Sequence, residues 1–193
     1  NLGNVTLSAN LQEMGKKAFG NGVSLTEIEI PKSLKTCHTN ADYLDNVYDG
    51  PFDQCEALKN ITFENGTKQI ASCLFAGCTG LKNIKIPETV TIIYSKAFNG
   101  CENLGKIEIP DSVTEIERGA FGNCGSMVTA QIGNGVTTIG DAAFLNCKKL
   151  SGVKLSANLQ EMGKKAFGNC VSLTEIEIPK GLKTCHTNAD YLD

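Results

Sequence analysis

The sequence contains one long passage twice. Residues 7–45 and residues 155–193 carry one 39-residue passage, which begins LSANLQEMGKKAFGN and differs between the copies only at Gly22/Cys170 and Ser33/Gly181. Self-similarity of this kind indicates a repeat architecture, in which each copy packs on its neighbours. A shorter period should therefore lie beneath the long one.

That shorter period is 23 residues. The segment LKNIKIPETVTIIYSKAFNGCEN, residues 81–103, aligns without a gap to LGKIEIPDSVTEIERGAFGNCGS, residues 104–126. The alignment predicts a single domain over residues 1–193 with about eight units, and all unit spacings are 23 except one of 33 that carries an insertion at about residues 38–50. The units begin at Leu2, Leu25, Leu58, Leu81, Leu104, Met127, Leu150 and Leu173.

Each unit follows the pattern L-x-x-I-x-I-P-x-x-V-x-x-I-x-x-x-A-F-x-x-C-x-x, whose places we number as positions 1–23. Apolar residues at positions 4 and 6 alternate with polar ones, which predicts a half-buried strand. Proline at position 7 has no N–H to donate and should end strand pairing there. The rest of the unit is too short for a long helix and predicts a turn or a short 3-10 segment. The prolines at position 7 are Pro31, Pro87, Pro110 and Pro179.

Position 18 holds a phenylalanine in seven units, and position 20 is Asn or Gly in six of those seven. Asn and Gly tolerate a left-handed backbone, so we expect a tight turn there. No unit can bury its apolar side alone, whereas stacked units bury continuous ladders of Leu, Ile, Phe and Cys. The prediction is a parallel solenoid. Its phenylalanines are Phe19, Phe52, Phe75, Phe98, Phe121, Phe144 and Phe167.

Two of the units, IPETVTIIYSKAFNGCENL and IPDSVTEIERGAFGNCGSM, resemble the BspA-like leucine-rich repeats, which are related to the Treponema-type repeats of surface proteins. The resemblance covers essentially the whole chain. It implies a right-handed, curved coil with a parallel β-sheet on one face and turns or short 3-10 segments on the other. It also implies secreted or cell-surface proteins that engage other proteins, with fibronectin and fibrinogen as ligands of some members. The family has no fixed binding residues to transfer.

Composition excludes several classes of function. The net charge is −3 and the pI is near 5.5, which argues against a nucleic-acid or anionic-membrane surface. No run approaches the roughly 18 apolar residues of a membrane span. The chain starts at Asn1 and stops at Asp193, within a second copy of the insertion, so we expect a processed or excised piece of a longer array. Uncapped ends of such a piece could associate end to end.

The nine cysteines do not predict chemistry. Six fall at position 21, where a small apolar filler of a ladder is the simplest interpretation, although neighbouring thiols about 5 Å apart could form a bridge. Cys37–His38 and Cys185–His186 lack the further ligands of a zinc site, and DYLDNVYDG lacks the order of a calcium loop. We expect no catalytic residues, no cofactor and no metal, and therefore no enzyme.

Positions 3 and 5 should point outward from the sheet. They place Glu27 and Glu29 on one strand, Lys85 on another, and Lys106 and Glu108 on the next. Lys85 should face Glu108, and Lys154 should face Glu177, in pairs that contribute at most about 1 kcal/mol. The face lacks aromatic anchors, so it is either solvated or a weak contact surface.

The insertion is the stronger candidate for partner contact. Its off-pattern residues sit in an irregular loop on a rigid scaffold, where binding tends to reside, although the tyrosines could instead cover a gap in the ladder. The candidate contact residues there are Asp42, Tyr43, Asp45, Tyr48 and Asp49. Three N-x-T sequons, at Asn4, Asn60 and Asn65, are acceptors only in a eukaryotic secretory host.

These features predict a non-enzymatic interaction or adhesion module that is extracellular or at the cell surface. Its predicted partner is a protein, with extracellular matrix proteins as candidates. The alternative is a structural spacer that projects another domain from the surface. A carbohydrate-binding module is a distant third, because the sheet face has no aromatic platform.

Overall fold

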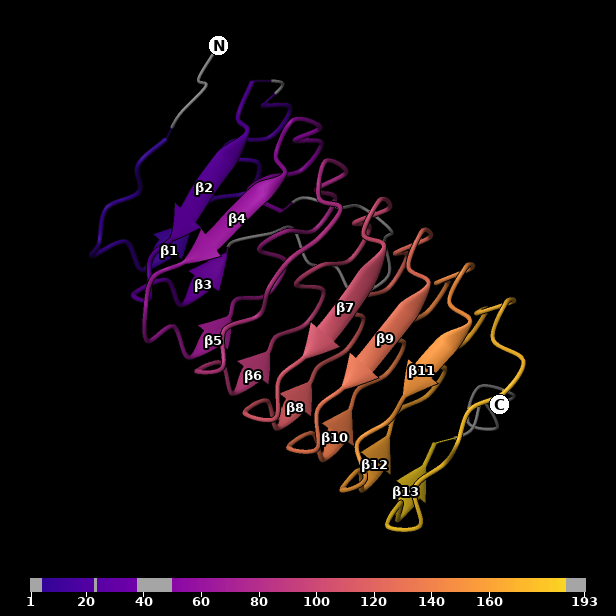
Figure 1. The fold of residues 1–193 in the computed structure, drawn as a ribbon. Coiled ribbons are helices and arrows are strands. Elements are labelled where there is room, and N and C mark those ends of the chain that lie inside the picture. Colours follow the sequence, from indigo (N-terminus) through magenta and orange to yellow (C-terminus); the bar gives the residue numbers. More distant parts are fainter. Residues whose placement is uncertain (1–4, 23, 38–49, 187–193) are drawn as a thin grey trace, which may run out of the picture.

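The computed structural model describes residues 5–22, 24–37 and 50–186, which form a coil of parallel strands and turns (Figure 1). Within this part of the chain there is no helix, and so none that could cross a bilayer. The part of each unit that holds the phenylalanine consists of turns, as one of the two sequence-based alternatives predicted. The predicted solenoid is confirmed.

The longer strands lie at positions 3–6, where the alternating pattern predicted them. In β2, β7 and β9 the outward residues are exposed and the inward ones buried in strict alternation. The pairings among these longer strands are parallel and form two sheets, β2–β4 and β7–β9–β11. The row comprises β2 (Glu27–Ile30), β4 (Asn60–Phe63), β7 (Lys106–Ile109), β9 (Thr129–Ile132) and β11 (Gly152–Lys154). The unit that begins at Leu81 contributes no strand to it.

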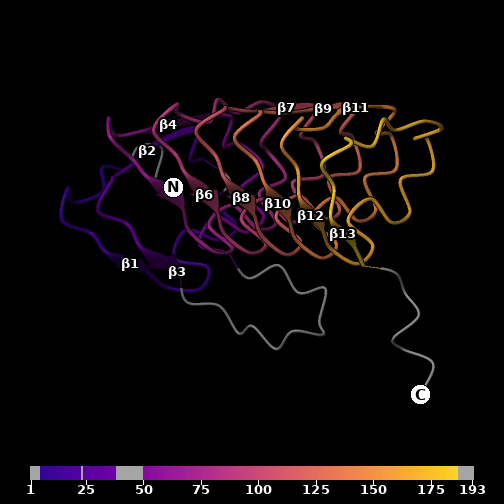
Figure 2. The same cartoon turned by 90° about the horizontal axis from the view of Figure 1, so that it is seen from below.

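A second row of two-residue strands runs at positions 12–13, which the sequence did not predict. Figure 2 shows it on a different side of the coil from β4, β7, β9 and β11. Its members are β1 (Glu13–Met14), β3 (Thr36–Cys37), β5 (Gln69–Ile70), β6 (Ile92–Ile93), β8 (Glu115–Ile116), β10 (Thr138–Ile139), β12 (Glu161–Met162) and β13 (Thr184–Cys185). β1 pairs with β3 and the other six form one sheet, so this row breaks where the insertion follows Cys37.

The core lies between the two rows and is built from ladders. The phenylalanines at position 18 stack face to face, with ring centroids 5.1 Å apart for Phe98–Phe121 and 5.2 Å for Phe121–Phe144. Backbone hydrogen bonds follow the same stack, because the N–H of Phe98 donates to Ala120 at 2.7 Å and that of Phe121 to Ala143 at 2.8 Å. Each turn of the coil is thus tied to the next through side chains and backbone together.

The left-handed turn at position 20 is confirmed, with φ from 56° to 61° at its asparagines. Asn is preferred to Gly in the later units for a further reason, because the side-chain amides form a ladder. Asn146 donates to Asn123 at 2.8 Å and Asn169 to Asn146 at 2.9 Å, whereas Asn123 donates to Asn99, at position 19 of its unit, at 3.2 Å. An amide at this position therefore satisfies the turn and also links neighbouring units.

A second left-handed position, position 16, carries no such compositional signal. The residue there has positive φ in six units, yet only Gly119 among them is a glycine. The others are Lys17, Cys73, Lys96, Ala142 and Lys165. An L-residue in this conformation costs roughly 1–2 kcal/mol, so the coil holds these turns against a local preference.

Replacing Ala142, whose φ is 54°, by Gly should stabilise the array by about 0.5–1 kcal/mol. The relieved strain exceeds the entropy that glycine adds to the unfolded chain. Urea unfolding followed by circular dichroism measures the change. The reverse substitution Gly119→Ala should destabilise by a similar amount because its φ is 61°, and no clash adds to that strain, since the new Cβ would meet Asn99 and Lys96 at ordinary contact distances. If both substitutions shifted the free energy of unfolding in the same direction, or neither shifted it, this account would be contradicted.

Candidate interaction surface

The outward side chains of the longer strands form two parallel lines across the exposed sheet face. Strand register aligns Lys106 with Thr129 and then Gly152, and it aligns Glu108 with Gln131 and then Lys154. In the first sheet, Glu27 aligns with Asn60 and Glu29 with Thr62. All these side chains are exposed except for Gly152, which is half-buried. The rigid ladder beneath fixes their spacing.

The structure places only some of the predicted contact residues together. Lys85, Lys106 and Glu108 line one groove, whereas Glu27 and Glu29 lie outside it on β2. The candidates from the insertion lie outside the described residues, and their contacts stay a prediction. These are Asp42, Tyr43, Asp45, Tyr48 and Asp49.

The predicted pairing of Lys85 with Glu108 is wrong. Glu108 is held by Lys106 of its own strand, with Nζ and Oε1 3.1 Å apart and both side chains more than half exposed. Positions 3 and 5 share one face of a strand, so this neighbour reaches the carboxylate as readily as the next strand does. Such an exposed pair contributes little stability. Among the described residues Lys154 likewise makes no ion pair with Glu177, which belongs to a segment that forms no strand.

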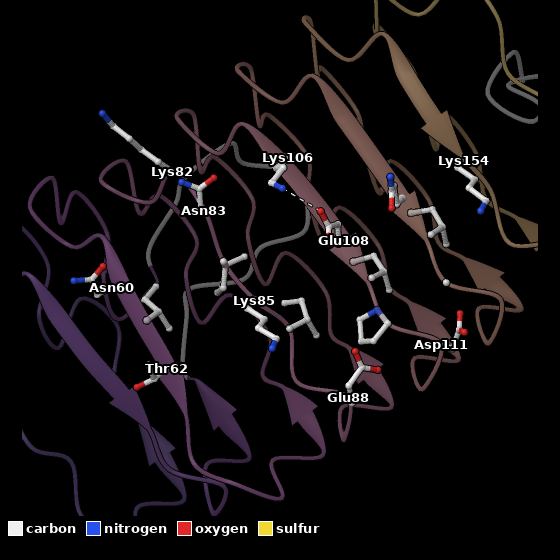
Figure 3. A pocket seen from close by; sticks show the side chains of 18 of the residues that line it. Asn60, Thr62, Lys82, Asn83, Lys85, Glu88, Lys106, Glu108, Asp111 and Lys154 are labelled. Atoms are coloured by element: carbon white, nitrogen blue, oxygen red, sulfur yellow. Dashed lines mark hydrogen bonds and ion pairs between the residues drawn. The ribbon is translucent and has the colours of Figure 1, made fainter.

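The groove has a volume of about 1100 Å³ and lies over the gap between β4 and β7 (Figure 3). Five lysines and three acidic residues line it, among them residues that sequence reasoning did not select. Lys59 and Lys82 both occupy position 2 of successive units, and Glu88 and Asp111 both occupy position 8. Comparing charges at equal positions of neighbouring units would have revealed these two pairs.

The ladder cysteines fill the core between units, as their register predicted. All nine cysteines are free thiols, and those at position 21 are buried. Several of these thiols donate a hydrogen bond to the backbone carbonyl of the phenylalanine in the preceding unit. Cys101 donates to Phe75 and Cys147 to Phe121, both at 3.2 Å. Burial, assisted by the neighbouring Cys55, raises the pKa of Cys78 to about 12, so its thiolate is scarce at neutral pH.

Metal binding has no support in this part of the molecule. Within residues 5–22, 24–37 and 50–186, no group of three His, Cys, Asp or Glu side chains could hold an ion. Burial, with Cys73 nearby, raises the pKa of Cys37 to about 12, which makes it a poor nucleophile and a poor ligand. What the groove offers a ligand is the charged and hydrogen-bonding side chains that line it.

Comparison with known families gives a match along the whole chain. Residues 1–48, 45–129 and 75–191 match the BspA type leucine rich repeat region, in six copies. A search of curated proteins found no match.

Solved structures of bacterial proteins share this fold. The leucine-rich repeat protein of T. pallidum is 27% identical with a TM-score of 0.70, and the match covers 89% of this chain and 78% of that one. A leucine rich cell surface protein of Faecalibacterium prausnitzii A2-165 is 29% identical (TM-score 0.58), with 97% of this chain and 42% of that one covered. A leucine-rich repeat protein of Bacteroides ovatus is 25% identical (TM-score 0.57), with 89% and 48% covered. The chain thus spans less than half the length of the latter two.

Proposed function

Because the chain belongs to the BspA-type leucine-rich repeat family, we propose that it is a non-enzymatic adhesion module that contacts other proteins outside the cell. Repeat solenoids of this kind are generally non-enzymatic. One similar structure is described as a cell surface protein, which supports an extracellular or surface location. Extracellular matrix proteins are the proposed ligands.

The observation that carries this proposal is the exposed, charged sheet face. Lys85 and Lys154 make no ion pair among the described residues, although both lie on a scaffold whose core is continuous. The scaffold fixes the backbone positions of these lysines, and their unpaired ammonium groups are available to a ligand, which orders each side chain at a cost of about 0.5–1.5 kcal/mol. The insertion at about residues 38–50 remains the second proposed contact surface.

The alternative proposal is a structural spacer. A spacer requires only the ladders, so it predicts that neither the sheet face nor the insertion has a ligand. Self-association of the array is also proposed, and it is supported by the exposure of Val171 (74%) at the end of the seventh unit and of Ile178 (46%) in the eighth.

We expect the array to bind immobilised fibronectin or fibrinogen saturably in surface plasmon resonance. Removing residues 39–48 shortens the long unit from 33 to the ordinary 23 residues and keeps Gly50 and Phe52 at positions 16 and 18. Loss of binding in this variant assigns contact to the insertion, and loss in Lys85→Ala/Lys106→Ala assigns it to the sheet face.

The matched control for the lysine variant is Lys148→Ala/Lys149→Ala, which removes two exposed lysines outside the groove. Sedimentation velocity at the same concentrations separates ligand binding from self-association. If neither the parent nor any variant binds fibronectin or fibrinogen, and circular dichroism shows an intact fold, the spacer is the better description.

A further inference from the structure

The exposed sheet is interrupted at the fourth unit. Residues 82–86 are framed by β4 and β7 but pair with neither as a strand. In the described part of the chain, the backbone N–H groups of residues 83–86 have no backbone partner, and one hydrogen bond, from Gly105 N–H to the Lys82 carbonyl, joins this segment to the next unit. The strand edges beside it consequently keep free hydrogen-bonding groups.

The interruption uncovers part of the core. Position 4 points inward, and in the closed part of the sheet its residues Ile107 and Ala130 are each 1% exposed. At the interruption the residues at the same position, Ile61 and Ile84, are only partly buried and line the groove. The groove therefore has an aliphatic floor, which a plain sheet face would not have.

The two ends of the groove carry opposite charges, whereas Lys85, Glu108 and Lys154 lie at position 5 between them. Figure 3 shows Lys82 and Lys106 towards the start of the strands, and Glu88 and Asp111 beyond their ends. Lys59 adds a further positive charge at the start. Among the described residues Lys59, Lys82 and Glu88 form no ion pair, so their charges are not neutralised within the protein.

We propose that this groove binds an extended segment of a partner protein that is acidic at one end, aliphatic in its middle and basic at the other. The proposal deepens the proposed function and rests on it, because it names the chemistry of the partner at the sheet face. The acidic end meets Lys59 and Lys82, aliphatic side chains cover Ile61 and Ile84, and the basic end meets Glu88.

The length of the segment follows from the geometry of the unit. Positions 2 and 8 are separated by six residues of nearly extended chain, or about 20 Å. A partner segment of about seven residues spans that distance. In an extended segment, alternate side chains share a face, so residues 1, 3, 5 and 7 would face the groove.

The polarity of the rim favours a polypeptide over a sulfated polysaccharide. A uniformly anionic chain long enough to cross the groove would place negative charge on Glu88 and Asp111, which is unfavourable. A polypeptide can change the sign of its charge within seven residues. It also carries backbone groups that can meet the free strand edges.

The test uses two peptides with opposite polarity, Asp-Asp-Val-Thr-Val-Lys-Lys and Lys-Lys-Val-Thr-Val-Asp-Asp, each acetylated and amidated. Isothermal titration at physiological salt measures their affinity for the 193-residue chain. One of the two peptides should bind saturably. The strand edges fix the N-to-C direction of the bound segment, and in that direction only one of the peptides brings its acidic end to the lysines. Lys59→Glu/Lys82→Glu should weaken it at least tenfold, whereas Lys148→Glu/Lys149→Glu, with the same change in net charge, should weaken it less than twofold.

Two further ligands decide between classes of partner. The all-acidic peptide Asp-Asp-Val-Thr-Val-Asp-Asp should bind at least tenfold more weakly than the favoured peptide, and Glu88→Lys should reduce that difference. Tighter binding of a heparin hexasaccharide that is lost in Lys59→Glu/Lys82→Glu would overturn the proposal in favour of a polysaccharide. Absence of saturable peptide binding, or equal loss in both lysine variants, would overturn it outright.

The outcomes separate this proposal from the proposed function. If the parent chain binds fibronectin or fibrinogen, Lys59→Glu/Lys82→Glu binds equally well and no peptide binds saturably, the groove proposal fails and the adhesion proposal stands. If a peptide binds in the groove but neither matrix protein does, the groove proposal stands and those ligands are wrong.

Discussion

The folded array is expected to unfold cooperatively between about pH 9 and 10.5. The cause is the cysteine ladder at position 21, whose six thiols are at most 7% exposed. Burial raises the pKa of Cys78 to about 12, and it raises the pKa values of Cys101 and Cys124 as well. In the unfolded chain the same thiols titrate near pH 8.5.

The direction follows from proton linkage. A thiol whose pKa is raised in the folded state contributes stability that is fully present below its unfolded pKa and is lost as the pH rises towards the folded pKa. At a pH where a thiol is ionised in the unfolded chain but not in the folded one, it lowers the free energy of unfolding by about 1.4 kcal/mol per pH unit. Six such thiols lower it by about 8 kcal/mol per pH unit. A domain of this size has about 5–15 kcal/mol of stability, which is exhausted within one to two pH units.

The measurement is the urea midpoint between pH 8 and 10 in the presence of a reductant, with thiolate absorbance near 240 nm recorded in parallel. The triple variant Cys101→Ala/Cys124→Ala/Cys147→Ala should show about half the pH slope, whatever its stability at neutral pH. Thiolate absorbance that rises while the circular dichroism stays unchanged would contradict the account, because the thiols would then ionise inside the folded coil.

The sequence predicted the repeat and its strongest contacts because these depend on periodic composition. Phe at position 18 and Asn or Gly at position 20 recur in almost every unit, and the structure gives them the expected stack and the expected turn. The second row of strands was missed because a strand of two residues, such as Ile92–Ile93, is too short to show an alternating pattern. The left-handed position 16 was missed because Lys96 and Ala142 carry no glycine signal.

The groove was missed for a different reason. Residues 82–86, KNIKI, have the same alternation as KIEI of β7, yet only the latter forms a strand. Local sequence therefore does not report the interruption, which depends on how neighbouring units stack. The charges at its rim were visible, but neighbouring units were compared only at positions 3 and 5, which leaves out Lys59 at position 2 and Glu88 at position 8.

Removing one interior phenylalanine should break the array into two weakly coupled halves. Phe121 is fully buried and stacks on Phe98 at 5.1 Å and on Phe144 at 5.2 Å. Phe121→Ala should cost about 3–5 kcal/mol for the lost side chain and its cavity, towards the upper end because two ring contacts disappear together. That is a large share of the total stability, so urea unfolding should become broader or biphasic instead of two-state.

The position of a ring in the ladder should set the size of the effect. Phe167 is partly buried and has one stacking partner in the described part of the chain, Phe144 at 5.1 Å, so Phe167→Ala should cost about half as much as Phe121→Ala. Phe121→Leu keeps most of the volume and should cost about 1–2 kcal/mol with a single transition. Hydrogen exchange locates the boundary, since protection should fall first around residues 98–144 in Phe121→Ala. Equal costs at Phe121 and Phe167 would mean that the rings contribute only as separate buried side chains, and the nearest-neighbour description of this coil would then be wrong.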